Sequence, residues 1–549
     1  MLEVRTIILE LVQLIAKKFP QEIFFPVLVW HASHPHHVND NNNNTASQSG
    51  KSKIPPSIRD MHSALASATE CFAQGLVDLS QVWIEKWLRA INSAWGRFEA
   101  RDYDPVCEEL SLLMKNLRNT EVPIEKVHYE RNMEIYTKLQ SAITHYQLTK
   151  RESDVLSVWA TIDSISQNLN ERQKNMKSLS LQLVSPWLAQ IHGGCELYIP
   201  GTRTLLYRIS DVVDILPSKQ RPRKVAMYSE DGTLHNFLLK GNEDLRQDER
   251  VQQLFHVVNR MLKQNRNTRT RAEKYLIGTY SVTPLEPTVG LCQWLEGTAT
   301  FAHVVKEERK ANGISSDLEY HLLMEAAGTT AKPHDYYLLS AKKKGEAFET
   351  AIGQSPGKDL YNYLWQTSPS TEAWLDRRET FTKSSATMSM VGHVLGLGDR
   401  HPNNILLHET SGRSIHIDFG DCFEVAMTRR RYPESVPFRL TRMMVNAMGV
   451  GGLEGPFTRG CGNVLGFMCE GRDTVIALLE AFVHDPLMNW NVNPSTAVQR
   501  AHAKLNVSTR ASAATPSRDE IGQKVMTLIK NATAPENLAS CYLGWSPYW

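Results

Sequence analysis

The stretch Gly396-Leu-Gly-Asp-Arg-His-Pro-Asn-Asn404, followed by Ile417-Asp-Phe-Gly420, decides the fold of this chain. Phosphoryl transfer from ATP commonly uses an aspartate that orients the accepting hydroxyl, an asparagine five positions later on one magnesium ion, and a D-F-G aspartate on another. Asp399, Asn404 and Asp418 reproduce that spacing. We therefore predict an ATP-dependent kinase in which Asp399 is catalytic and Asn404 and Asp418 bind Mg²⁺, with Mn²⁺ as an alternative.

The residues around these motifs have the pattern of a helix followed by a strand hairpin. Residues 388–397 are apolar at helical spacing, and residues 405–407 and 414–417 read as two short strands joined by turn residues. A lone D-F-G is a common tripeptide, and a lone Asp-Arg-His is most often a solvated turn. Their combination at this spacing favours the catalytic interpretation.

Length and composition allow several folded domains and exclude some functions. The chain has 549 residues, of which 42% are hydrophobic, and 61 basic against 59 acidic side chains leave a net charge of +2. No global basic surface favours nucleic acid, so nucleic-acid binding is not expected. Eight cysteines without paired C-x-x-C spacing are typical of a reducing compartment. Residues 7–19 are too short and too charged for a membrane span, so we expect a cytoplasmic location.

The N-terminal third is predicted to be helical. Residues 31–54 are polar and include four consecutive asparagines, which predicts a disordered or looped insertion. Its histidines could bind a metal, but without cysteines a solvated loop is the better interpretation; they are His31, His34, His36 and His37. Residues 60–170 have helical periodicity, and their tryptophans are by default core residues, with an exposed ligand face as the minority interpretation.

Strand chemistry begins at residues 224–228 and 234–240, which surround an Asp-Gly turn, and a helical apolar face follows at 251–262. Lys240 ends the second strand. A kinase small lobe uses such a lysine to hold the α- and β-phosphates and an acidic side chain to hold the lysine. The alternative is a surface lysine beside an acidic first helical turn. The acidic candidates are Glu243, Asp244 and Asp248.

Two further segments have a predicted place in a kinase. The apolar residues 290–295 fit a hinge that lines adenine. Residues 305–360 are polar and helical in patches, and the basic run at 342–344 is interpreted as a solvated face.

Taken together, the chain resembles the target-of-rapamycin kinases within the phosphoinositide 3-kinase-related protein kinases. His401 follows the catalytic aspartate instead of preceding it, as in that group. The resemblance covers most of the chain. It rests on residues 218–224, 238–250, 396–404, 416–428, 437–441, 480–487, 536–538 and 541–549.

The resemblance implies an α+β, two-lobed protein kinase-like fold of the phosphoinositide 3-kinase type, preceded by an all-α region with a four-helix bundle. Residues 1–80 would be the end of a FAT region, 82–170 a rapamycin-binding FRB bundle, 171–516 the catalytic domain with its small lobe to about 296, and 517–549 a FATC tail. The implied partners are protein substrates, larger scaffold proteins of the target-of-rapamycin complexes, and a WD-repeat subunit on residues 305–360. Peripheral association with endomembranes is an alternative to a purely cytoplasmic location.

The resemblance also implies residue roles. Lys240 and His401 would join Asp399 as catalytic residues, with His401 stabilising the transferring phosphoryl group. Glu243 and Asp248 are the candidate partners of Lys240, and Trp95 and Trp159 match the ligand face of the FRB bundle. The residues implied to line the nucleotide are Ser218, Gln220, Leu238, Tyr280, Trp294, Leu295, Thr300, Leu406 and Ile417.

Four departures from the family pattern affect these expectations. Gln293 stands where the family has a hinge glycine, which predicts altered inhibitor fit more than altered ATP binding. Ser546 replaces a second tail cysteine and removes a possible disulfide with Cys541. Bulky Trp95 replaces a small serine, which argues against binding of rapamycin with its immunophilin. The long helical solenoid of the family does not precede residue 1, so we expect a fragment or a truncated gene model.

Two other functions remain open at this point. Arg429-Arg-Arg431 lie in the activation segment, the stretch that follows the D-F-G motif at Asp418-Phe-Gly420. They could bind an inositol phosphate, which favours a phosphoinositide kinase. A catalytically weak scaffold is the other alternative, although every catalytic motif is present. The flanking FRB-like and FATC-like segments favour a Ser/Thr protein kinase in growth and nutrient signalling.

Overall fold

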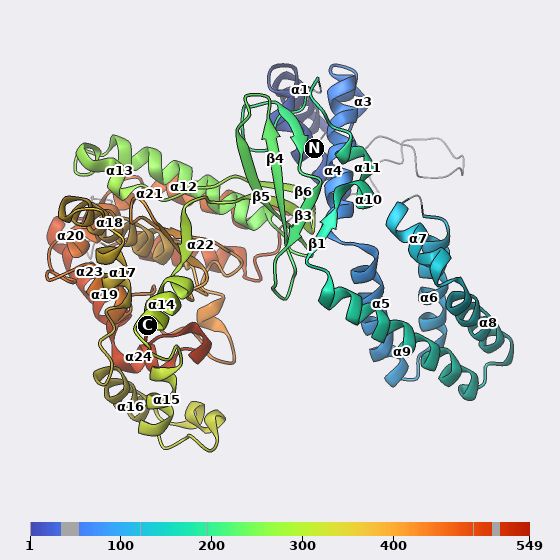
Figure 1. Cartoon of the computed structure of the whole chain (residues 1–549). Helices are drawn as coiled ribbons and strands as arrows, with labels where there is room; N and C mark the ends of the chain where they lie inside the picture. Colours follow the sequence, from blue (N-terminus) through green and yellow to red (C-terminus); the bar gives the residue numbers. More distant parts are fainter. Residues whose placement is uncertain (1, 34–53, 121, 195, 487, 508–515) are drawn as a thin grey trace. The chain divides into compact units, whose positions relative to one another are not determined.

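The computed structural model describes residues 2–33, 54–120, 122–194, 196–486, 488–507 and 516–549. The chain divides into two compact units, one built from residues 1–246 with 281–294 and the other from 247–280 with 295–549. Both helices and sheets contribute, which confirms the predicted α+β class (Figure 1). Within the described ranges, no helix has both the length and the apolar character that a membrane crossing requires.

The first unit begins with helices, as predicted. They are α1 (Leu2–Lys18), α2 (Pro20–Ser33), α3 (Pro56–Arg59), α4 (Ser63–Ser80), α5 (Trp83–Glu99), α6 (Tyr103–Arg118), α7 (Pro123–Arg131), α8 (Met133–Thr149) and α9 (Glu152–Asn175). Helices α5 to α9 share a hydrophobic core that includes Trp87, Leu110, Leu139 and Ile162.

The default that tryptophans lie in the core holds for Trp83 and Trp87 but is wrong for Trp95. Trp95 is 45% exposed, because the buried stripe of α5 runs through Ile91 and Ala94 and leaves the next position at the surface. Its ring lies 5.0 Å from the ring of Trp159 and 5.7 Å from that of Phe98. The predicted ligand-face residues Trp95 and Trp159 are therefore brought together in a surface aromatic cluster.

The two ends of the insertion predicted at residues 31–54 are folded, which corrects the predicted bounds. His31 belongs to the last turn of α2, and Ile54 is 1% exposed, so both ends are part of the folded unit. The intervening residues 34–53, with His34, His36 and His37, lie outside the described residues.

An antiparallel sheet completes the first unit. Its elements are β1 (Ser178–Ser180), α10 (Leu181–Val184), α11 (Pro186–Ala189), β2 (Leu206–Ile209), β3 (Val212–Ile215), β4 (Arg223–Ser229), β5 (Leu234–Gly241), β6 (Val282–Glu286) and β7 (Val289–Gln293). The strand order is β1-β3-β4-β5-β7-β6, with β2 on β4. The predicted β4–β5 hairpin is confirmed, with Val225 opposite Phe237. Helices α2 and α4 contact the sheet and share its core, so one face of the sheet is buried.

The second unit is mostly helical. Helix α12 (Arg246–Gln264) belongs to this unit from Gln247 onward. The other elements are η1 (Arg269–Arg271), α13 (Ala272–Tyr275), β8 (Thr298–Thr300), α14 (Phe301–Ala311), α15 (Leu318–Ala326), η2 (Pro333–Leu338), α16 (Ala341–Gly353), α17 (Asp359–Gln366), α18 (Thr371–Leu395), β9 (Ile405–His408), β10 (Ser414–His416), η3 (Ala426–Thr428), α19 (Arg442–Ala447), α20 (Pro456–Glu470), α21 (Arg472–Val483), α22 (Pro494–Leu505), α23 (Arg518–Thr533), α24 (Pro535–Ser540) and η4 (Leu543–Trp545).

Helix α18 positions the catalytic loop. Every residue from Thr380 to Leu395 is buried, so this part of the helix lies in the middle of the unit. Several of its small polar side chains form hydrogen bonds within the helix; Thr387, for example, donates to the carbonyl of Lys383 at 3.0 Å. Gly396 ends the helix in the left-handed conformation (φ 67°), a conformation that glycine adopts without steric cost. The motif that begins at Gly396 therefore starts from a fixed, buried point.

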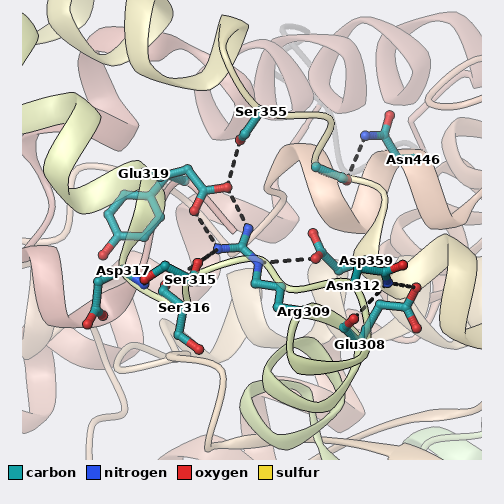
Figure 2. A network of polar contacts seen from close by, with 12 residues as sticks. Glu308, Arg309, Asn312, Ser315, Ser316, Asp317, Glu319, Ser355, Asp359 and Asn446 are labelled. Atoms are coloured by element: carbon teal, nitrogen blue, oxygen red, sulfur yellow. Dashed lines mark hydrogen bonds and ion pairs between the residues drawn. The ribbon is translucent and has the colours of Figure 1, made fainter.

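The predicted insertion at 305–360 is held together by a buried polar network (Figure 2). Arg309 on α14 donates to both carboxylate oxygens of Glu319 on α15, at 2.5 and 2.6 Å, and to Asp359 on α17 at 3.1 Å. Ser355 donates to Glu319 at 2.7 Å. Burial raises the pKa of Glu319, but these hydrogen bonds outweigh it and lower the pKa overall. The network joins three helices that are separate in sequence.

The basic run 342–344 is only partly a solvated face, which corrects the prediction. Lys342 and Lys343 are exposed, but Lys344 is half-buried and donates to the carbonyl of Tyr337 at 3.0 Å. Burial lowers the pKa of Lys344.

Candidate active site

The catalytic loop is a closed turn in the second unit. The side-chain nitrogen of Asn404 donates to the carbonyl of Asp399 at 2.9 Å, and its backbone N–H donates to the carbonyl of His401 at 2.9 Å. Asp399 adopts a left-handed conformation, with φ 56°. Such a conformation in a residue with a side chain costs of order 1–3 kcal/mol and persists only where the surroundings enforce it. Asp399 and Asn404 are thus brought together as predicted.

The activation segment lies directly against this loop. The N–H of Gly398 donates to the carbonyl of Asp421 at 2.8 Å, and the N–H of Glu424 donates to the carbonyl of Gly396 at 2.8 Å. A Cβ at Gly398 would lie 2.3 Å from the Cβ of Ala426, closer than two carbon atoms can approach. Glycine at this position is therefore required by the close approach of two chain segments.

Arg400 joins the catalytic loop to the D-F-G backbone. It is 3% exposed and donates to the carbonyls of Gly398 and Ile417, each at 2.7 Å, and to that of Asp418. Sequence analysis did not assign Arg400 a role, and its place directly after Asp399 was the one available signal.

Asn404 and Asp418 suit a magnesium ion. They flank the β9–β10 hairpin, and the N–H of Ile417 donates to the carbonyl of Asn404 at 3.1 Å. Because Asn404 uses its side-chain nitrogen on Asp399, its oxygen is the atom left for a cation. Asp418 is exposed, and among the described residues its carboxylate has no hydrogen-bond or ion-pair partner.

No group of three or more His, Cys, Asp or Glu side chains that could hold a metal occurs in the described part of the chain. Magnesium in phosphoryl-transfer sites is typically held by one or two protein ligands together with substrate phosphates and water. Two oxygen donors are therefore the donor set expected here, and the residues present fit the metal.

His401 lies beside Asp399, with its Nε2 atom 4.0 Å from the Asp399 Oδ2 atom. The Nδ1 atom accepts a hydrogen bond from the backbone of Asn403 at 3.2 Å, which assigns the proton of the neutral ring to Nε2. Burial lowers the pKa of His401, although the nearby carboxylates oppose that shift. A neutral His401 that presents Nε2–H next to Asp399 fits its predicted role at the transferring phosphoryl group.

The first unit carries the predicted lysine and part of the predicted nucleotide site. Leu238 and Lys240 alternate on β5 with the core residues Phe237 and Leu239, so they share the face away from that core. The Nζ atom of Lys240 lies 2.8 Å from the Glu243 carboxylate, which places Glu243 in its predicted position.

The other candidates of the first unit occupy its loops. Ser218 and Gln220 are exposed between β3 and β4. Trp294 follows β7, donates its N–H to the carbonyl of Asn236 at 2.9 Å, and has the Lys224 ammonium 4.9 Å from its ring. Gln293, the departure from the hinge glycine, accepts from the N–H of Ser281 through its side chain at 3.1 Å.

The second unit holds the other candidates. Asp248 accepts a hydrogen bond from the N–H of Phe419 at 3.3 Å, so this carboxylate contacts the D-F-G backbone. Tyr280 is buried, and its backbone N–H donates a hydrogen bond to the side-chain oxygen of Gln252 at 3.2 Å. Thr300 caps α14 and pairs with Leu406 between β8 and β9. Leu295 precedes β8, and Ile417 follows β10.

Known families match both the catalytic region and the tail. Residues 235–492 match the family described as phosphatidylinositol 3- and 4-kinase, and residues 520–549 match the FATC domain. The catalytic region of the chain, residues 235–492, is therefore similar to the phosphatidylinositol 3- and 4-kinase family.

Curated relatives of the chain confirm the predicted resemblance to the target-of-rapamycin kinases. The chain is 37% identical to Serine/threonine-protein kinase TOR of Arabidopsis thaliana over 89% of its length, and 32% identical to Serine/threonine-protein kinase mTor of Drosophila melanogaster over 97%. It spans 20% and 24% of these relatives. The chain is thus similar to about a fifth to a quarter of each curated relative.

Solved structures show the same fold. The open conformation of CtTel1 matches with a TM-score of 0.57 and 22% identity, over 90% of this chain and 21% of that one. The FAT and kinase domain of CtTel1 matches with a TM-score of 0.56 and 21% identity, over 98% of this chain and 35% of that one. The predicted phosphoinositide 3-kinase-type fold with a helical region before it is confirmed.

A kinase domain of this family implies ATP and a divalent metal. Beside its catalytic loop lies a cavity of ≈ 720 Å³, bordered by Pro402 and Asn403, by Tyr320 and Tyr337 of the insertion, and by Tyr542 of the tail. The cavity thus adjoins Pro402 and Asn403, the two residues that follow His401 in the catalytic loop.

Proposed function

We propose that this chain is a Ser/Thr protein kinase of the target-of-rapamycin type, which transfers the γ-phosphate of ATP to protein hydroxyls. The observation that carries the proposal is the closed loop in which Asn404 and Arg400 fix Asp399 and Asp418. Phosphoryl transfer depends chiefly on positioning and on charge stabilisation. The closed loop supplies the positioning.

In the proposed reaction, Asp399 orients the acceptor hydroxyl and takes its proton. His401, neutral and protonated on Nε2, would donate toward the transferring phosphoryl group. Asn404 and Asp418 would hold Mg²⁺, with Mn²⁺ as an alternative, and the metal would neutralise charge on the β- and γ-phosphates. Lys240, paired with Glu243, would hold the α- and β-phosphates; this role and those of the other nucleotide-site residues remain proposals.

Proteins are the proposed substrates in preference to lipids. Arg429 forms an ion pair with Asp421, so one of the three activation-segment arginines is already engaged within the segment. Arg430 and Arg431 remain exposed. The relatives that match most of the chain have names of Ser/Thr protein kinases, which supports the protein assignment.

The deciding experiment is a Mg²⁺-ATP assay of the purified chain on a Ser/Thr peptide library beside phosphatidylinositol vesicles. We expect peptide phosphorylation. The triple variant Arg429→Ala, Arg430→Ala, Arg431→Ala should still phosphorylate a neutral peptide. Robust labelling of phosphatidylinositol, with none of any peptide or protein, would establish a phosphoinositide kinase instead.

We further propose that a WD-repeat subunit binds the 305–360 insertion and that larger scaffold proteins complete the complex. The buried Arg309 network gives the insertion a fixed interior, while Leu338 is 76% exposed on its outer surface. The proposed location is cytoplasmic, with peripheral contact to endomembranes as an alternative. A Leu338→Asp variant that still bound the subunit would contradict this docking surface.

Rapamycin with its immunophilin is not proposed as a partner. Trp95 contacts Trp159 and Phe98, so the position that is a small serine in the family is filled by an indole. A ternary complex formed by this chain at sub-micromolar rapamycin would overturn that proposal. A Trp95→Ser variant is the matched test for gain of binding.

A further inference from the structure

Glu434 contacts the backbone of the predicted catalytic aspartate from the far end of the activation segment. Its Oε1 atom accepts a hydrogen bond from the N–H of Asp399 at 2.7 Å, across 35 residues of sequence. The N–H of Glu434 donates to the carbonyl of Ala426 at 3.1 Å. The segment that carries Arg429-Arg-Arg431 is therefore closed at its base, and its closing residue contacts Asp399.

Glu434 contacts the backbone of a residue in an unfavourable conformation. Asp399 has φ 56°, and a non-glycine residue is held in that conformation only by its surroundings. The bond to Glu434 acts on the N–H of Asp399, while the Asn404 side chain acts on its carbonyl. Both ends of the residue are thus fixed, and its carboxylate is directed by two hydrogen bonds made by other residues.

The environment of Glu434 is costly for a carboxylate. The side chain is 8% exposed, and within the described ranges it forms no ion pair with a Lys or Arg side chain. Burial raises the pKa of Glu434 to about 7, although its hydrogen bond from Asp399 and the nearby arginines oppose that shift. The titratable and charged groups that face it are Asp399, Arg400, Arg429, Arg439 and Cys541. A buried carboxylate without an ion-pair partner is costly in its charged form, so a positioning role is the better explanation for its presence.

We propose that Glu434 is a positioning residue for catalysis: its carboxylate oxygen holds the Asp399 backbone in the conformation that directs the Asp399 side chain at the acceptor hydroxyl. The proposal rests on the proposed function only in taking Asp399 as the group that orients the acceptor. Through this hydrogen bond, the activation segment contacts Asp399 directly. Glu434 itself does not touch substrate.

Three substitutions separate positioning from other roles. Glu434→Gln keeps an acceptor oxygen at the same distance and removes the charge. Glu434→Leu keeps the volume and removes the acceptor. Glu434→Asp keeps the charge, but its side chain is one methylene too short to reach the Asp399 N–H. The matched control is Glu424→Gln on the same segment, which loses ion pairs with Lys504 at 2.6 Å and Arg500 at 3.2 Å but no side-chain contact with the catalytic loop.

The measurements are kcat, the KM values for ATP and acceptor, and Tm, with whichever hydroxyl acceptor the wild type phosphorylates. Displacement of a catalytic group by about 1 Å can lower a rate roughly 100-fold. We expect kcat to fall about 10- to 100-fold in the Leu and Asp variants, with KM values unchanged and with recovery to within about threefold in the Gln variant. The Glu424→Gln control should lower Tm without a selective loss of kcat.

Several outcomes would overturn the proposal. They are a Gln variant as slow as the Leu variant, Leu and Asp variants with normal kcat, or losses confined to the KM for ATP. If the Leu variant does not fold, the comparison of Gln with Asp decides the matter. Because the acceptor is chosen by the wild type, a lipid acceptor would refute the protein-kinase function and leave the role of Glu434 still decided by these rates.

Discussion

Arg439 offers the sharpest test of how the tail supports the catalytic loop. It follows the activation segment, is 4% exposed, and donates to the carbonyls of Trp545, Ser546 and Trp549 at 2.7, 2.8 and 3.3 Å. A fourth, longer contact of 3.4 Å reaches the carbonyl of Arg400 in the catalytic loop. The perturbation is Arg439→Met, which preserves an unbranched side chain and removes all the donors.

The expected loss can be worked from these contacts. Hydrogen bonds to a charged group contribute roughly 1.5–3 kcal/mol each, so the three tail contacts sum to about 5–9 kcal/mol before solvation is considered. Burial lowers the pKa of Arg439 to about 9, which shows that the guanidinium is itself poorly solvated there. Arg439→Met also removes the cost of burying the guanidinium, which offsets part of this sum. The expected net loss in free energy of unfolding is about 3–5 kcal/mol, as is usual when one partner of a buried charged pair is removed.

The assay combines thermal unfolding with hydrogen exchange. At roughly 2 °C per kcal/mol for a unit of this size, the Tm of the catalytic unit should fall by about 6–10 °C. Amides of residues 545–549 should exchange faster, and kcat should fall because Arg400 loses a neighbour. Arg431→Met is the matched control, since Arg431 is exposed and its replacement should change stability by less than about 0.5 kcal/mol. Unchanged exchange at 545–549 in a folded Arg439→Met variant would refute this reasoning.

Three further results are expected. Asp399→Asn should leave ATP binding nearly intact and lower turnover by roughly two to four orders of magnitude, whereas Asp418→Ala should abolish metal-dependent nucleotide binding; equal, mild effects on both quantities would contradict the assigned roles. Cys541 is fully buried, and burial raises the pKa of its thiol to about 12. It should therefore resist alkylation and oxidation in the folded chain, while the exposed Cys71 is labelled. An oxidant-dependent mobility shift that Cys541→Ser removes would contradict this expectation. Because the folded pKa of Glu434 is raised to about 7 from 4.5, its contribution to stability is complete below pH 4.5 and is lost as pH rises through 7, by up to about 3 kcal/mol. The Tm of the wild type relative to Glu434→Gln should therefore fall between pH 5 and pH 8, and a constant difference would count against the raised pKa.

Sequence patterns were informative where the chemistry is local. The spacing of Asp399, Asn404 and Asp418 and the alternation through Lys240 each lie within one loop or hairpin, so the pattern and the structure agree. Periodicity was less reliable for Trp95, because a shift of one position on a helix moves a side chain from the core to the surface.

Residues whose partners are distant in sequence could not be found from local patterns. Glu434 stands outside every segment singled out from the sequence, and Arg439 lies in one, residues 437–441, that suggested no role for it. The roles of both residues depend on segments 35 or more than 100 positions away. The side chain of Arg400 reaches the D-F-G backbone 17 and 18 residues later. Loop closure over such separations is set by tertiary packing, and a spacing rule contains no information about it.

The lack of room for a side chain at Gly398 has a consequence for related sequences. A side chain there would collide with Ala426, so even alanine would force the catalytic loop away from the activation segment. A paralogue that kept Asp399, Asn404 and Asp418 but carried alanine at this position would pass a comparison of the reactive residues as an active enzyme. Inactive descendants of this fold can therefore arise through one added methyl group while every reactive side chain is retained.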